Sequence, residues 1–244
     1  MTPQLAEIWV YLSATPLLGL TATLLAYLVA WRIYQRTGMT PIANPVAIAV
    51  VLLVALLVLT GTPYRTYFDG AQFVHFLLGP ATVALAIPLY DQRARLVRLW
   101  LPLTLGLVAG VITAIASALG IAWALGASRE TLLSLAPKSV TTPIAMGIAE
   151  KIGGLPSLTA VFVILTGMTG AIIARPLLNA LRIDAHPARG FAVGVAAHGI
   201  GTARAFQVSE QMGAFAGLAM GLTALVTAFI APWLAPALVS ALTR

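Results

Sequence analysis

The sequence predicts an all-α integral membrane protein with about six spanning helices plus two re-entrant hairpins or broken helices, arranged as an internal, inverted repeat. Composition, the length of the apolar runs and the repeat lead to this prediction. The 244 residues are 60% hydrophobic and 9% charged, with a mean hydropathy of +0.96. Soluble domains are about 45–50% apolar and about 25% charged, and they leave a quarter to a third of their chain surface exposed. The solvent for this surface is therefore lipid.

Six apolar segments approach the roughly 20 residues that a spanning helix needs. They cover residues 9–31, 44–60, 71–90, 99–123, 156–175 and 213–238, of which 44–60 is short. Trp9, Trp31, Trp100 and Trp233 lie at or near the predicted ends, where indole rings favour the membrane interface. Residues 77–80 contain a Gly-Pro pair, which we expect to kink the third span without any chemical role for the neighbouring His75.

Two stretches, 128–153 and 187–212, do not fit a simple spanning helix. Each has two short apolar arms around a polar centre punctuated by Gly or Pro, at 136–143 and 197–204. Non-helical backbone at membrane depth is tolerated only where protein or a wet cavity satisfies its polar groups. Each stretch is therefore either a re-entrant hairpin or a broken spanning helix.

The distribution of positive charge favours hairpins. If 128–153 does not cross, eight of the fourteen bases share one side, namely Arg32, Arg36, Arg93, Arg95, Arg98, Arg175, Arg182 and Arg189. If it crosses, the bias falls to five against six. Because cytoplasmic loops carry an excess of Lys and Arg, the first arrangement is preferred, with the Arg182 loop in the cytoplasm.

Residues 138–178 repeat weakly at an offset of 60. Nine of these 41 positions are identical to their partners, including Thr142/Thr202, Glu150/Glu210 and Gly153/Gly213. With one spanning helix between the hairpins, the two units have opposite orientation, which is a recurring plan of secondary transporters. We expect residues 1–127 to form a scaffold and dimerisation side, and 128–244 a transport core with units 128–180 and 187–240.

The first candidate binding site comprises Lys138, Ser139, Thr141 and Thr142. A lysine within the membrane is costly and needs a partner or a function. A helix beginning near Thr142 and Pro143 would direct free N–H groups and the positive dipole end at an anion such as a carboxylate. The alternative is a lysine that binds loop carbonyls or lies at the interface.

The second candidate site is the equivalent segment, with His198, Gly199, Gly201, Thr202 and Arg204. The glycines permit close backbone approach, and a guanidinium matches a carboxylate in geometry. His198 titrates near physiological pH and is a candidate proton relay, although such a histidine is more often a structural hydrogen-bond donor.

Glu150 and Glu210 close the two segments, and we expect them to pair with Lys151 and Arg204 or to carry a coupling proton. The chain has no cysteine and no catalytic triad, metal-ligand spacing or phosphate loop. We therefore expect no enzymatic activity, no cofactor and no bound metal. The net charge of +7 lies in short clusters between apolar runs rather than in a basic soluble domain, so nucleic acid is not an expected partner.

At these motifs the sequence resembles the LrgB/CidB family of bacterial inner-membrane proteins. The stretches that carry the resemblance are 77–90, 137–146, 152–167, 197–205 and 213–221. The family was named for antiholin-like modulation of murein hydrolases and autolysis. A related plastid protein is the glycolate/glycerate translocator, which fuses an LrgA-like and an LrgB-like half, and bacterial relatives are linked to pyruvate uptake.

The resemblance implies a multi-pass protein of the bacterial cytoplasmic membrane that transports small 2-hydroxy or 2-oxo monocarboxylates, either uncoupled or coupled to protons or another ion. The alternative is an antiholin-like modulator of murein hydrolase activity. It also implies an LrgA/CidA-like small membrane protein as partner, and we expect a homo-oligomer, a dimer. Gly147 stands where many relatives are expected to carry Glu, which argues against proton coupling through that position.

Overall fold

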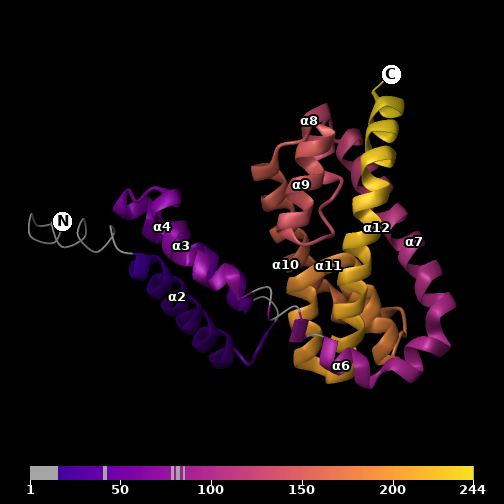
Figure 1. Ribbon diagram of the computed structural model, residues 1–244, viewed down its shortest axis with the longest axis horizontal. Coiled ribbons are helices and arrows are strands. Elements are labelled where there is room, and N and C mark those ends of the chain that lie inside the picture. The colour runs from indigo at the N-terminus through magenta and orange to yellow at the C-terminus, as the bar shows by residue number, and fades with distance from the viewer. Residues whose placement is uncertain (1–15, 41–42, 78–79, 81–82, 85, 244) are drawn as a thin grey trace, which may run out of the picture. The chain divides into compact units, whose positions relative to one another are not determined.

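The computed structural model describes residues 16–40, 43–77, 80, 83–84 and 86–243, and this part of the chain is helical and contains no strand. The all-α class expected from the sequence is thereby confirmed. The helices, labelled as in Figure 1, are α2 (Pro16–Arg36), α3 (Pro45–Thr60), α4 (Tyr64–Phe76), α6 (Ala86–Asp91), α7 (Arg93–Ala124), α8 (Arg129–Leu135), α9 (Thr142–Ile152), α10 (Pro156–Ala180), α11 (His186–Val208) and α12 (Glu210–Leu242).

Four of the described helices, α2, α7, α10 and α12, are long and apolar enough to cross a membrane, and α3 is apolar but shorter. They correspond to five of the six expected spans, although residues 9–15 of the first lie outside the described part. Of the remaining span, expected over 71–90, the structure describes the helices α4, which ends at Phe76, and α6, which begins at Ala86, whereas residues 78–79, 81–82 and 85 lie outside the described part.

The chain divides into two compact units, Met1–Ala84 and Leu85–Arg244. In the first, α2 packs against α3 and α4, and the hydroxyls of Thr23 and Tyr67 are hydrogen-bonded at 2.8 Å. A Cβ on Gly19 would stand 2.3 Å from the Tyr67 carbonyl oxygen, so a glycine is required at this contact. The expected division into a scaffold, residues 1–127, and a transport core, residues 128–244, refers to function rather than to compactness, and it stays a prediction.

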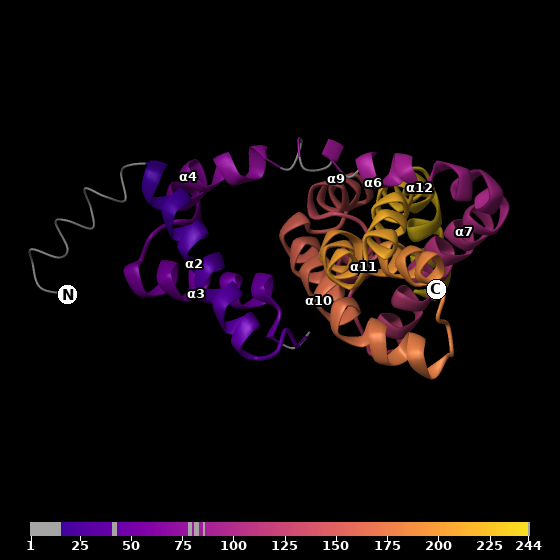
Figure 2. The same ribbon diagram turned by 90° about the horizontal axis from the view of Figure 1, so that it is seen from below.

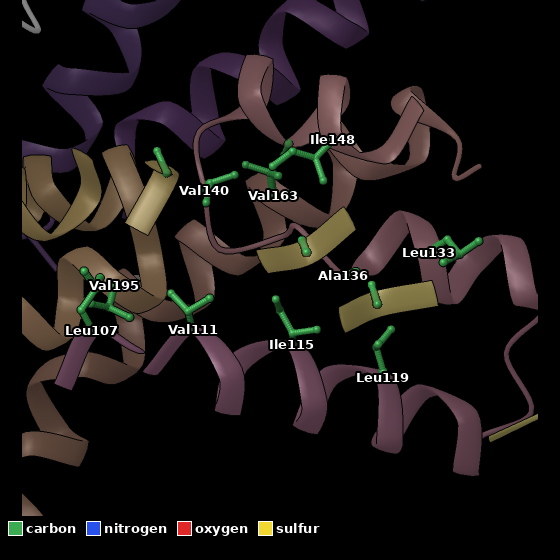
Figure 3. Packing of buried hydrophobic residues seen from close by; sticks show 14 of the residues in the cluster. Leu107, Val111, Ile115, Leu119, Leu133, Ala136, Val140, Ile148, Val163 and Val195 are labelled. Atoms are coloured by element: carbon green, nitrogen blue, oxygen red, sulfur yellow. The ribbon is translucent and has the colours of Figure 1, made fainter. Parts of the chain in front are cut away.

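The second unit is built around α12, which packs against α7, α9 and α11 (Figure 2). Its larger apolar cluster includes Val111 and Ile115 of α7, Val140 before α9, and Val163 of α10 (Figure 3). Small residues on α12 allow this close packing, since Ala219, Ala231 and Ala235 are all fully buried. In lipid, such small residues stabilise helix contacts by letting backbones approach.

Residues 129–152 form a hairpin that enters and leaves at one end of this unit. The Oγ of Ser134 in α8 accepts a hydrogen bond from the Leu155 N–H at 2.8 Å. Thr159 in the first turn of α10 donates to the Ser134 carbonyl at 2.9 Å. Helix α8 is thus fastened to the start of α10, and the chain turns back at 136–141 (Figure 1).

Residues 186–208 form a second hairpin, because α11 is interrupted at His198, where φ is 39° and ψ is −134°. A Cβ on Gly190 would meet the Met212 carbonyl at 2.2 Å, and one on Gly194 would meet the Ala216 carbonyl at 2.2 Å. The first arm therefore runs in the same direction as α12.

The second arm runs back along the same helix. A Cβ on Gly199 would lie 3.8 Å from the Met220 sulfur, whereas Gly213, seven residues nearer the start of α12, packs against the ring of Phe206. As the chain proceeds from Gly199 to Phe206, its neighbours on α12 proceed backwards from Met220 to Gly213. The hairpin alternative is therefore correct for both segments.

The two hairpins enter the unit from opposite ends (Figure 1). At the end where α11 begins, Ser209 and His186 are hydrogen-bonded at 2.9 Å, and Arg95 and Arg98 of α7 line a cavity together with Ala185 and His186. The Arg182 loop thus shares an end with the start of α7, as the hairpin arrangement requires. This is the geometry expected of an inverted repeat, and the repeat itself stays a prediction.

Candidate functional site

The tips of both hairpins reach the middle of α10. His198 Nε2 lies 2.9 Å from the Val163 carbonyl oxygen, and a Cβ on Gly167 would stand only 2.7 Å from the His198 ring. Val140, at the tip of the first hairpin, belongs to the same buried cluster as Val163 (Figure 3). The two segments selected from the sequence are therefore brought together within the second unit.

The polar groups of His198 are hydrogen-bonded within the protein. Because a carbonyl only accepts hydrogen bonds, Nε2 carries the proton and donates to Val163. The Thr202 hydroxyl in turn donates to the His198 carbonyl at 2.8 Å. Both side chains are buried, at 4% and 3% exposure. The polar groups of this tip have partners within the protein, and its left-handed backbone at His198 is held in place by them.

Lys138 lies at the tip of the first hairpin and is only half-buried. Its N–H donates to the Leu135 carbonyl at 3.1 Å, but its ammonium makes no hydrogen bond or ion pair within the part of the chain that the structure describes. The ammonium is close enough to act electrostatically on His198. An ammonium in this position needs a counter-charge.

Two buried hydroxyls also lack partners among the described residues, those of Ser139 and Thr223. Ser139 follows Lys138 at the tip and is 7% exposed, and Thr223 lies in α12 and is 1% exposed. Buried hydroxyls in proteins are almost always hydrogen-bonded. Sequence reasoning had selected Ser139 but missed Thr223, whose only signal is its place 60 residues after Val163.

The start of α9 adds further donors to the first tip. Thr141 is the N-cap of α9, but its side chain makes no capping bond. Thr142 is the first helical residue and Pro143 the second, so the N–H groups of Thr142 and Ile144 have no partner within the helix. Together with the helix dipole, these groups favour an anion.

The glycines of the second tip serve packing. A Cβ on Gly201 would lie 2.6 Å from the Ala197 Cβ and 2.8 Å from a Val193 methyl, both in the first arm. Gly199 faces the Met220 sulfur with more room. These contacts explain why the segment needs small residues, without requiring a ligand.

The structure does not bring the remaining predicted residues to the tips. Arg204 is six residues beyond His198, about 9 Å along a helical arm, and it donates to Gln207 Oε1, farther from the tip, at 2.8 Å. Glu150 is exposed in the last turn of α9, and Glu210 is exposed in the first turn of α12. Their predicted roles in substrate binding or coupling stay predictions.

A cavity of about 1130 Å³ lies between α7 and the first arm of α11. Its walls are mostly small or apolar, including Gly110, Ala192 and Ala196, and Arg95 and Arg98 lie at one end. None of the predicted site residues lines it. The polar tips and this apolar cavity are therefore separate features of the second unit.

Comparison with known proteins gives a consistent assignment. The LrgB-like family matches residues 23–237. The uncharacterized protein YwbG of Bacillus subtilis (strain 168) is 40% identical over 204 residues, which are 84% of this chain and 90% of YwbG. The uncharacterized protein YxaC of the same organism is 38% identical over 198 residues, 81% of this chain and 86% of YxaC. No solved structure matches. With its apolar spanning helices and this match over most of its length, the chain belongs to the LrgB-like family of membrane proteins.

Proposed function

We propose that this protein transports small monocarboxylates with a hydroxyl or oxo group at C2, such as glycolate, glycerate or pyruvate, across the bacterial cytoplasmic membrane. The observation that carries the proposal is the ammonium of Lys138 beside the hydroxyl of Ser139, neither of which has a partner among the described residues, at a hairpin tip that reaches the middle of a spanning helix.

The physical reason lies in the cost of leaving these groups without partners. Removing an ammonium from water costs several kcal/mol unless an opposite charge compensates it. A carboxylate supplies that charge, and its second oxygen accepts from Ser139 or from the free N–H groups at the start of α9. A small monocarboxylate has little apolar area, so its affinity depends on such charge-assisted hydrogen bonds.

The arrangement of the hairpins fits alternating access. Each hairpin enters from a different end, so each covers the tips from one side. Secondary transporters commonly place their substrate at the meeting point of two such broken elements. In this mechanism Lys138 binds the carboxylate, and His198 fixes the second tip to Val163.

We further propose that the protein is a homo-oligomer and acts with an LrgA/CidA-like partner, as the family resemblance implies. Modulation of murein hydrolases is the alternative function. It requires no substrate site, whereas the first tip carries an ammonium and a hydroxyl that bond to no side chain or backbone group among the described residues.

The proposal is tested by reconstituting the purified protein into liposomes, with and without the LrgA/CidA-like partner, and measuring uptake of labelled glycolate and pyruvate. We expect saturable uptake that unlabelled glycerate inhibits and an amino acid does not. A trapped fluorescent dye is the control for leakage. Dye release without selective uptake, or no uptake with the partner present, would contradict transport and favour the lysis-related function.

A further inference from the structure

Thr223 has no structural reason to be a threonine. It lies in an apolar spanning helix, it is 1% exposed, and its hydroxyl has no partner among the described residues. A buried hydroxyl without a hydrogen bond costs about 1–3 kcal/mol, and valine would occupy the same volume without this cost. By contrast, the buried Thr159 of α10 uses its hydroxyl to bind the Ser134 carbonyl.

The position of Thr223 along α12 is at the level of the hairpin tips. Met220, one turn earlier on the same face, lies 3.9 Å from the Thr202 hydroxyl through its sulfur. Helix α12 also packs against α8 and α9, which carry the first tip. Thr223 thus lies three residues after Met220, which contacts the second hairpin, on a helix that contacts both hairpins.

The offset of 60 residues adds an independent indication. The His198 ring contacts α10 at two positions. It is hydrogen-bonded to the Val163 carbonyl, and it packs against Gly167, where a Cβ would clash with it. At this offset His198 corresponds to Lys138, which lies 60 residues earlier. Val163 and Gly167 correspond to Thr223 and Thr227, which lie 60 residues later. Two structurally equivalent hairpins would therefore place Lys138 opposite Thr223 and Thr227, both of which are buried.

We propose that Thr223 is a substrate-binding residue that recognises the oxygen at C2 while Lys138 binds the carboxylate. This inference rests on the proposed transport function and adds a determinant of its specificity. The carboxylate oxygens and the C2 oxygen of such an acid form a compact set, matched by one ammonium and the two unpartnered hydroxyls of Ser139 and Thr223. An acid without the C2 oxygen leaves the Thr223 hydroxyl unpaired, which is the condition under which polar sites reject a ligand.

The test compares Thr223→Val with the wild type in liposomes, with glycolate and acetate as labelled substrates. Acetate lacks the C2 oxygen. We expect the preference for glycolate over acetate to fall roughly three- to tenfold, the loss of one neutral hydrogen bond. We also expect the thermal stability to remain equal or increase, because the variant removes an unpaired hydroxyl.

Thr104→Val in α7 is the matched control, because the Thr104 hydroxyl is exposed and, among the described residues, bonds only the Trp100 carbonyl of its own helix. An unchanged preference in Thr223→Val would overturn the inference, while wild-type glycolate uptake would leave the proposed function intact. If Thr223→Val does not reach the membrane folded, Thr223→Ser and Thr223→Ala decide. The serine variant must keep the preference and the alanine variant must lose it, and equal behaviour of the two would also overturn the inference.

Discussion

The two hairpins of the second unit have the same build but differ in how their polar tip residues are satisfied. At the second tip, the His198 ring donates to Val163 and Thr202 donates to the His198 carbonyl. At the first tip, Lys138 and Ser139 make no side-chain hydrogen bond within the described residues. At the equivalent positions 198 and 138, one polar side chain is therefore hydrogen-bonded within the protein and the other has no partner among the described residues.

This difference separates a structural role from a functional one. A tip whose donors and acceptors are paired inside the protein is stable by itself, and changes there should affect folding. A tip with an unpaired cation and an unpaired hydroxyl is stabilised only when a ligand arrives, and changes there should affect binding. Substitutions at the two tips are thus expected to have opposite consequences.

The largest expected effect is that of Lys138→Ala on uptake. Loss of the charged hydrogen bond to the substrate should cost about 1.5–3 kcal/mol, or roughly ten- to a hundredfold in the affinity for glycolate. Lys151→Ala is the control, because Lys151 is an exposed lysine at the end of α9. Concentration-dependent uptake in liposomes measures both variants, and near-normal affinity in Lys138→Ala would show that the site lies elsewhere.

His198→Ala should act on stability. It leaves the Val163 carbonyl without its donor, at a cost of about 1–2 kcal/mol for a hydrogen bond of this kind within a membrane protein. We expect a lower unfolding temperature, measured by size-exclusion chromatography in detergent after heating. Gly167→Ala should have the same effect, because its Cβ would stand 2.7 Å from the ring. Stability unchanged in both variants would mean that the second tip is not fixed by this contact.

Ser139→Ala should instead reduce uptake and leave the stability of the protein unchanged. The Ser139 hydroxyl has no partner in the part of the chain that the structure describes, so its removal should leave the unfolding temperature unchanged or slightly higher. Uptake should fall by a few fold, in line with about 0.5–1.5 kcal/mol for one hydrogen bond to the substrate. A clear loss of stability with full uptake would instead assign the hydroxyl a structural partner.

Arg204→Ala should have the smallest effect on uptake. Its guanidinium donates to Gln207, away from the tip, so we expect less than a threefold change in glycolate affinity, consistent with loss of an exposed polar contact of at most about 0.5 kcal/mol. Arg204→Lys serves as the comparison. A loss as large as that of Lys138→Ala, with no recovery in the lysine variant, would place the carboxylate at a bidentate guanidinium and move the site to the second hairpin.

The helical elements were predictable because lipid imposes a simple rule. Every backbone group must be hydrogen-bonded within its own segment, so long apolar runs form helices, and α3, α7, α10 and α12 lie where the hydropathy indicates. The hairpin at 128–153 was favoured correctly by the positions of the arginines.

The sequence by itself determined the membrane class, the spanning helices and the two segments in which polar residues interrupt apolar ones. Tertiary structure alone decided which of those polar residues are paired. His198 and Lys138 are equivalent in the sequence, but one meets the Val163 carbonyl and the other meets no described partner. Likewise Thr223 is one of several threonines in apolar helices, and only the packing of α12 leaves its hydroxyl buried and unpaired. The physical reason is that composition and periodicity fix local conformation, whereas hydrogen-bond pairing depends on distances between segments far apart in the chain.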